Sequence, residues 1–166
     1  MVICNSAWSK PKLNRKMVPQ PTKSQRDDVS ASYKDDGAPF GIMVVDDEKD
    51  ILEIVSRYLQ KWNFDVDSFS DPHVALERFK SRIDHYKLLI TDVRMPGMTG
   101  IELARRIVDL KPEINVVLMT AFEIDDFILP FNTRGSTRII RRQDILRKPF
   151  RLDEVCQAVK KHMLRG

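Results

Sequence analysis

From residue 41 onward, short apolar runs alternate with segments whose apolar residues recur every three or four positions. Short runs of β-branched and aliphatic residues favour buried strands, whereas the longer spacing is typical of amphipathic helices. The predicted strands are Ile42–Val45, Phe64–Phe69, Lys87–Thr91, Ile114–Met119 and Ile145–Leu146. The helical pattern covers residues 51–62, 74–79, 101–110 and 152–163.

Strands that alternate with helices predict βαβ units, and so an α/β fold in which a parallel sheet carries helices on both faces. Two helix starts carry local signals. Asp71 precedes Pro72 in the order expected for an N-cap followed by proline at the first helical position. Thr99 and Glu102 have the spacing of a capping box.

The segment Glu123–Asp144 does not fit the alternation. It contains Pro130 and Gly135 and lacks a clean helical stripe. We expect a broken or short helix there, so that an irregular segment replaces or shortens the fourth helix of the fold.

Residues 1–40 show neither the strand nor the helix period and are rich in Lys, Pro, Ser and Gln. This composition predicts a disordered tail, and the folded domain then covers residues 41–166. The tail is basic, with seven Lys and Arg against four Asp. It is either a solvated segment or an arm that contacts nucleic acid or an acidic partner, and nothing in it selects a ligand.

The overall composition argues against a membrane-spanning protein, a secreted protein and a cysteine-bound metal site. The chain is 42% hydrophobic and 31% charged, and no apolar run approaches the ~20 residues needed to span a membrane. The first ten residues lack the apolar core of a signal peptide, so we expect a cytoplasmic protein. The two cysteines, Cys4 and Cys156, fit no metal-binding spacing.

Polar residues follow four of the predicted strands. They are Asp46-Asp47, Asp92, Thr120 and Lys148. The carboxyl ends of parallel strands meet at one edge, where open α/β sheets bind ligands. Three carboxylates there would repel one another, and a divalent cation resolves the repulsion. Oxygen ligands with room for water and phosphate suit Mg²⁺.

This set of residues supports phosphoryl transfer onto a carboxylate. Asp92 would be the nucleophile and form an aspartyl phosphate. Lys148 and Thr120, with the metal, would stabilise the charge on the transferring oxygens. Taken singly, each residue is better explained as a helix cap, a turn residue or part of a loop, and the phosphoryl-transfer hypothesis depends on the four groups at one edge together.

Four motifs together resemble the receiver domain of two-component response regulators. They are Val-Val-Asp-Asp-Glu (44–48), Ile-Thr-Asp-Val-Arg-Met-Pro-Gly-Met-Thr-Gly (90–100), Met-Thr-Ala (119–121) and Lys-Pro-Phe (148–150). The resemblance implies a flavodoxin-like doubly wound sheet of five parallel strands in the order 2-1-3-4-5. The wider sequence is similar to stand-alone archaeal receivers.

The resemblance also implies roles for individual residues. Asp92 would accept phosphate from a sensor histidine kinase or a phosphotransfer protein, and Thr120 and Lys148 would contact the phosphoryl group. Asp46, Asp47, Asp92 and the backbone carbonyl of Arg94 would hold Mg²⁺. Lys148-Pro149 would be a cis peptide. The protein would be a switch rather than an enzyme, with only its own phosphorylation and dephosphorylation catalysed.

Three features depart from the family pattern. Ile145 stands where the family usually has an aromatic switch residue. The segment 134–142, which is rich in arginine, replaces a common small-residue turn and is either a solvated loop or an altered surface for an acidic partner. Arg94 and Phe122 occupy two positions that control access of water, and their size leads us to expect a long-lived phosphorylated state.

Two other functions compete with the switch. A phosphatase with an aspartate nucleophile would place it after the first strand in an Asp-x-Asp pattern, and Asp46-Asp47 is instead a doublet. A phosphorylation-independent binding module would use the 134–142 segment or the basic tail. No output domain follows Gly166, so we expect signalling by contact with an unknown protein target, without nucleic acid or membrane.

Overall fold

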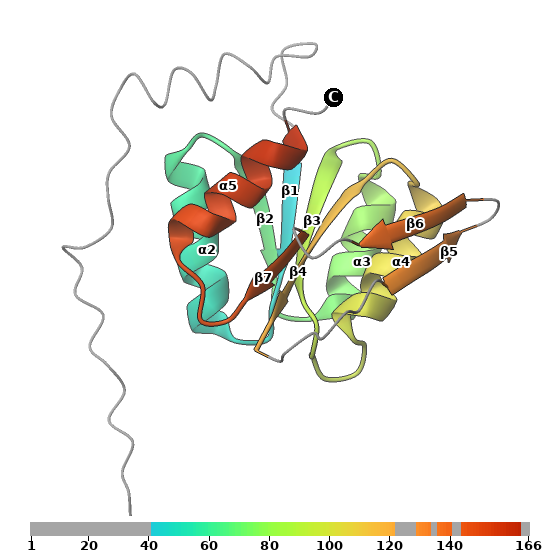
Figure 1. Ribbon diagram of the computed structural model, residues 1–166, viewed down its shortest axis with the longest axis horizontal. Coiled ribbons are helices and arrows are strands. Elements are labelled where there is room, and N and C mark those ends of the chain that lie inside the picture. The colour runs from blue at the N-terminus through green and yellow to red at the C-terminus, as the bar shows by residue number, and fades with distance from the viewer. Residues whose placement is uncertain (1–40, 122–128, 134–135, 141–143, 164–166) are drawn as a thin grey trace, which may run out of the picture.

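The computed structural model describes residues 41–121, 129–133, 136–140 and 144–163. Its centre is a parallel sheet of five strands in the order β2-β1-β3-β4-β7 (Figure 1). The strands are β1 (Gly41–Val45), β2 (Asp65–Phe69), β3 (Tyr86–Asp92), β4 (Asn115–Thr120) and β7 (Ile145–Arg147). The predicted 2-1-3-4-5 order is therefore confirmed.

Helices cover both faces of this sheet. They are α2 (Lys49–Lys61), α3 (Pro72–Ser81), α4 (Gly100–Leu110) and α5 (Leu152–Met163). Helices α2 and α5 lie on one face, and α3 and α4 lie on the other (Figure 1). Within the described ranges, no helix has the length and apolar character that a membrane crossing requires.

The hydrophobic core forms two layers, one on each side of the sheet. Successive side chains of a strand point to opposite faces, so Ile42 and Val44 of β1 pack under α2 and α5. Met43 and Val45 of the same strand pack under α3 and α4. All four side chains are fully buried. Both faces of the central strands are therefore covered, as their uninterrupted apolar runs predicted.

Both predicted helix starts are present. The Asp71 carboxylate accepts hydrogen bonds from the backbone N–H groups of His73 and Val74, at 2.7 and 3.4 Å, and Pro72 opens α3. The Thr99 hydroxyl accepts the N–H of Glu102 at 3.2 Å at the start of α4. These contacts satisfy amide groups that the first turn of a helix leaves without partners.

The expectation of a broken or short helix in Glu123–Asp144 is wrong for the part that the structure describes. There β5 (Leu129–Thr133) and β6 (Ser136–Ile140) pair antiparallel as a separate two-stranded sheet. Proline disfavours a helix interior, and the β-branched and aromatic residues of both segments favour strands. The tail 1–40, Phe122 and most of the arginines of 134–142 lie outside the described residues.

We predict that Leu89→Ala, in the centre of β3, lowers the free energy of unfolding by about 2–5 kcal/mol. Leu89 is fully buried in the layer under α3 and α4, so its truncation leaves a cavity. Urea denaturation monitored by circular dichroism measures the change. Val74→Ala, at a residue that is 55% exposed, serves as the control and should shift stability by no more than ~0.5 kcal/mol. Equal losses in the two variants would contradict the packing described.

Candidate functional site

The carboxyl ends of four strands bring the predicted site residues to one edge of the sheet. Asp46 follows β1 directly, and Asp92 and Thr120 are the last residues of β3 and β4. Lys148 follows the last residue of β7. Because these four strands are adjacent and parallel, residues far apart in the sequence meet there.

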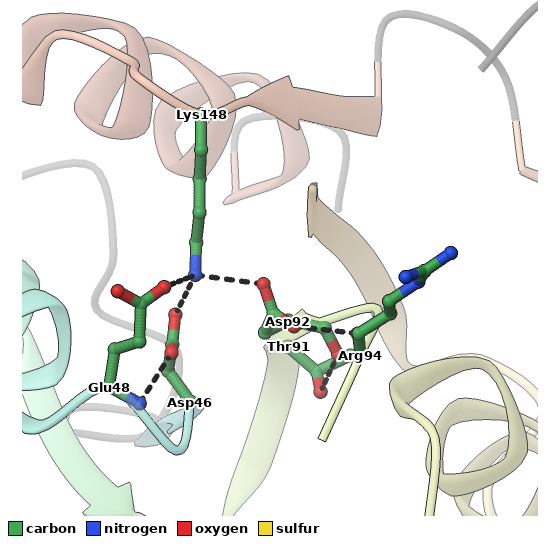
Figure 2. A network of polar contacts seen from close by, with 6 residues as sticks. All are labelled: Asp46, Glu48, Thr91, Asp92, Arg94 and Lys148. Atoms are coloured by element: carbon green, nitrogen blue, oxygen red, sulfur yellow. Dashed lines mark hydrogen bonds and ion pairs between the residues drawn. The ribbon is translucent and has the colours of Figure 1, made fainter. Parts of the chain in front are cut away.

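The ammonium group of Lys148 lies at the centre of this site (Figure 2). Its Nζ is 2.8 Å from Asp46 Oδ2, 2.8 Å from Asp92 Oδ1 and 2.9 Å from Glu48 Oε1. The side chains of Asp46 and Asp92 are 0% and 8% exposed. A single cation thus joins two buried carboxylates and a third carboxylate at the rim.

Backbone amides occupy the other oxygen of each buried carboxylate. The N–H of Arg94 donates to Asp92 Oδ2 at 2.6 Å, and the N–H of Glu48 donates to Asp46 Oδ1 at 2.9 Å. Each aspartate is therefore fixed from two sides, and its orientation is set before any ligand binds.

Burial and charge shift the pKa values of two groups here. Burial raises the pKa of Asp46, because a carboxylate removed from water is less stable, although Lys148 and the N–H of Glu48 partly offset this effect. Burial alone would lower the pKa of Lys148, but its hydrogen bonds to Asp46, Asp92 and Glu48 dominate and raise that pKa above its usual value. Lys148 therefore stays charged at neutral pH.

A backbone hydrogen bond links Thr120 to Lys148. The N–H of Lys148 donates to the carbonyl oxygen of Thr120 at 2.6 Å, and Thr120 is buried. The peptide bond between Lys148 and Pro149 is cis, as the resemblance implied. The ends of β4 and β7 are thereby held next to each other.

The remaining predicted residues lie at the rim. Asp47 and Arg94 are exposed, and Figure 2 shows the Arg94 side chain pointing away from Lys148. In the described ranges, no three acidic, histidine or cysteine side chains gather closely enough to hold a metal ion by themselves. Asp46, Asp47 and Asp92 nonetheless offer oxygen ligands, which Mg²⁺ prefers. Asp46 Oδ2 forms an ion pair with Lys148 and has no hydrogen-bond partner among the described residues.

Sequence reasoning missed two residues. Glu48 was quoted within a motif but given no role, although it contacts Lys148. Gly100 opens α4 beneath the site, where an added Cβ would lie 1.8 Å from the carbonyl oxygen of Asp92. The glycine therefore permits α4 to approach the end of β3 closely. Its position next to the Thr99 cap was the available signal.

A parallel sheet of this order, with a lysine between aspartates at its carboxyl edge, defines an α/β protein of flavodoxin-like topology. The family model described as the response regulator receiver domain matches residues 42–160. The chain belongs to this family of phospho-accepting signalling switches of two-component systems.

Individual relatives agree with this assignment. The response regulator receiver protein CpdR of Brucella abortus is 28% identical over 123 residues, which cover 74% of this chain and 96% of the relative. A putative two-component response regulator of Arabidopsis thaliana is 39% identical over 82 residues, which cover 49% of this chain but only 13% of that longer protein.

A solved structure shows the same fold. The complex of CheX and CheY with beryllium fluoride and magnesium from Borrelia burgdorferi matches with a TM-score of 0.63 and 21% identity. The match covers 75% of this chain and 90% of that one. The comparison with a solved structure therefore also confirms the fold class that the sequence predicted.

We predict that Gly100→Ala costs about 1–3 kcal/mol of stability, because the new methyl group forces the backbone of Asp92 or of α4 to move. Thermal or urea unfolding measures the cost. Arg105→Ala, at an exposed position of the same helix, introduces alanine away from the core and is the control. A Gly100→Ala protein as stable as the parent chain would show that the close approach to Asp92 is wrong.

Proposed function

We propose that Asp92 is the phosphoacceptor of this receiver and that Lys148 and Thr120 assist the transfer. The observation that carries this proposal is the position of Lys148 Nζ, 2.8 Å from Asp92 Oδ1 and 2.8 Å from Asp46 Oδ2. A fixed ammonium group beside a nucleophilic carboxylate can neutralise the charge that develops on the transferring phosphoryl oxygens.

The reaction is a displacement at phosphorus. A carboxylate oxygen of Asp92 forms the new bond to phosphorus while the bond from phosphorus to the donor's histidine nitrogen breaks. The electron pair of that bond stays on the imidazole, and the product is an acyl phosphate on Asp92. The N–H of Arg94 contacts Asp92 Oδ2 and Lys148 Nζ contacts Asp92 Oδ1, so the carboxylate is oriented before the transfer.

Asp46, Asp47, Asp92 and the carbonyl of Arg94 would hold Mg²⁺, which supplies positive charge against the phosphoryl oxygens when bound. The carboxylates outnumber the cation at this edge, so a divalent ion would also relieve their repulsion. The CheX–CheY complex from Borrelia burgdorferi, solved with beryllium fluoride and magnesium, supports the proposal.

The partners follow from the family. The phosphoryl donor would be a histidine kinase or a phosphotransfer protein, and the phosphorylated chain would signal by contact with a protein target. The relative in complex with CheX supports an output of this kind. The acyl phosphate would end by hydrolysis at the same site, so the protein is a reversible switch whose only catalysis acts on itself.

We predict that acetyl phosphate with Mg²⁺ adds one phosphoryl group to the parent chain and none to Asp92→Asn, since the amide is no longer a nucleophile. Intact-mass spectrometry measures the gain. Omitting Mg²⁺ should reduce it strongly. Asp109→Asn, an exposed acid on α4, is the matched control and should be phosphorylated as the parent is. No mass gain in any folded protein would favour the phosphorylation-independent binding module instead.

We predict that Arg94→Asn and Phe122→Ala each shorten the lifetime of the phosphorylated protein. The resemblance to the family implies that these two positions control access of water to the acyl phosphate, so removal of a long or large side chain should speed hydrolysis about threefold, equivalent to ~0.7 kcal/mol in the barrier. Decay of the phosphorylated mass after removal of the donor gives the rate. A rapid decay in the parent chain that neither substitution changes would overturn this expectation.

A further inference from the structure

Glu48 stands at a helix start but does not act as a cap. It is the N-cap residue of α2, and its side chain makes no hydrogen bond to the first-turn amides. The side chain instead reaches Lys148, 100 positions later in the sequence, at 2.9 Å. Serine, threonine, aspartate or asparagine would serve better as a cap, so the contact with Lys148 is the distinctive feature of this position.

The Lys148 ammonium group donates a hydrogen bond to Glu48 Oε1 at 2.9 Å. Its Nζ also forms ion pairs with Asp46 Oδ2 and Asp92 Oδ1, each at 2.8 Å. Glu48 therefore holds one of the three N–H donors of the ammonium group, and a phosphoryl oxygen would compete with the carboxylates for this group.

The exposed fractions of the three side chains indicate which carboxylate separates most readily from Lys148. The Asp46 side chain is 0% exposed and that of Asp92 is 8% exposed, whereas that of Glu48 is 62% exposed. Separating Lys148 from a buried carboxylate leaves an unpaired charge without water, which is costly. Separating it from Glu48 costs little, because water replaces the ammonium group.

We propose that Glu48 is a positioning residue that occupies one donor of Lys148 in the unphosphorylated protein and is displaced from it by the phosphoryl oxygen. This inference rests on the proposed function, since it assigns Glu48 a part in the same transfer. Glu48 thereby favours the unphosphorylated state and slows transfer. Once the phosphoryl group is in place, Glu48 faces water and no longer influences its hydrolysis.

The test compares three variants with the parent chain. Glu48→Gln removes the charge, and Glu48→Asp keeps the charge but shortens the side chain so that it no longer reaches Lys148. Glu53→Gln removes the same charge from α2, where Glu53 pairs with Arg57 at the surface, and is the matched control. Circular dichroism confirms that each variant is folded.

Two readouts apply to every variant. NMR of the Lys148 ammonium group, assigned with Lys148→Arg, reports its partners in the free protein and with Mg²⁺ and beryllofluoride as the phosphoryl analogue. Rates of phosphorylation by acetyl phosphate and of dephosphorylation are measured by mass spectrometry. Titration with Mg²⁺ alone, followed by NMR, gives the affinity for the metal.

We expect both Glu48 variants to shift the ammonium signal in the free protein and to leave it unchanged in the beryllofluoride form. Phosphorylation should become about two- to fivefold faster, the range of an exposed ion pair, and dephosphorylation should stay constant. Glu53→Gln should change neither rate.

Other results overturn the proposal. An unshifted ammonium signal in the free Glu48 variants shows that the contact is absent. Equal changes in both rates, or a Glu48→Asp protein that behaves as the parent does, show a general charge effect. Weaker Mg²⁺ binding with slower phosphorylation assigns Glu48 to the metal instead.

A parent chain that gains no phosphoryl group refutes the proposed function. The ammonium signal of the free protein still tests the contact between Glu48 and Lys148 separately.

Discussion

The structure depends on the balance of charge around one ammonium group. Lys148 is within 2.9 Å of three carboxylates, and two of them, Asp46 and Asp92, are almost completely buried. Buried carboxylates repel each other and are poorly stabilised without water, and the charge of the lysine offsets both effects. The sheet order makes the balance attainable, because it sets β1 and β4 on either side of β3 and places β7 next to β4.

The rest of the fold keeps these charges in place. The central strands are buried on both faces, and backbone hydrogen bonds tie the loops after them to neighbouring strand ends. Val93 N–H donates to the Met119 carbonyl at 2.8 Å, and Lys148 N–H donates to the Thr120 carbonyl at 2.6 Å. Gly100 then allows α4 to pack against the backbone of Asp92. The carboxylate of Asp92 is therefore held by main chain and packing as well as by Lys148.

Most of this arrangement could be predicted from the sequence because its causes are local or periodic. Apolar runs marked the strands, and Asp71 and Thr99 marked two helix starts. The position of polar residues at strand ends located the edge where Asp46, Asp92 and Lys148 meet. The antiparallel pair of β5 and β6 escaped prediction, since proline and glycine in a sequence indicate a break in a helix as readily as a turn between strands. Glu48 escaped because its partner is distant in the sequence and only the folded sheet brings the two together.

The position of Lys148 in the chain has a consequence for synthesis. A ribosome completes β1, β2, β3 and β4 before it reaches β7, the strand that delivers the lysine. Until then, Asp46 and Asp92 lie at the edge of an unfinished sheet without their cation, and contacts over such sequence separations form slowly. A nascent or truncated chain that ends before residue 148 thus lacks the ammonium group that pairs with Asp46 and Asp92. The charge balance at this edge of the sheet is completed only when the chain has been translated and folded through β7.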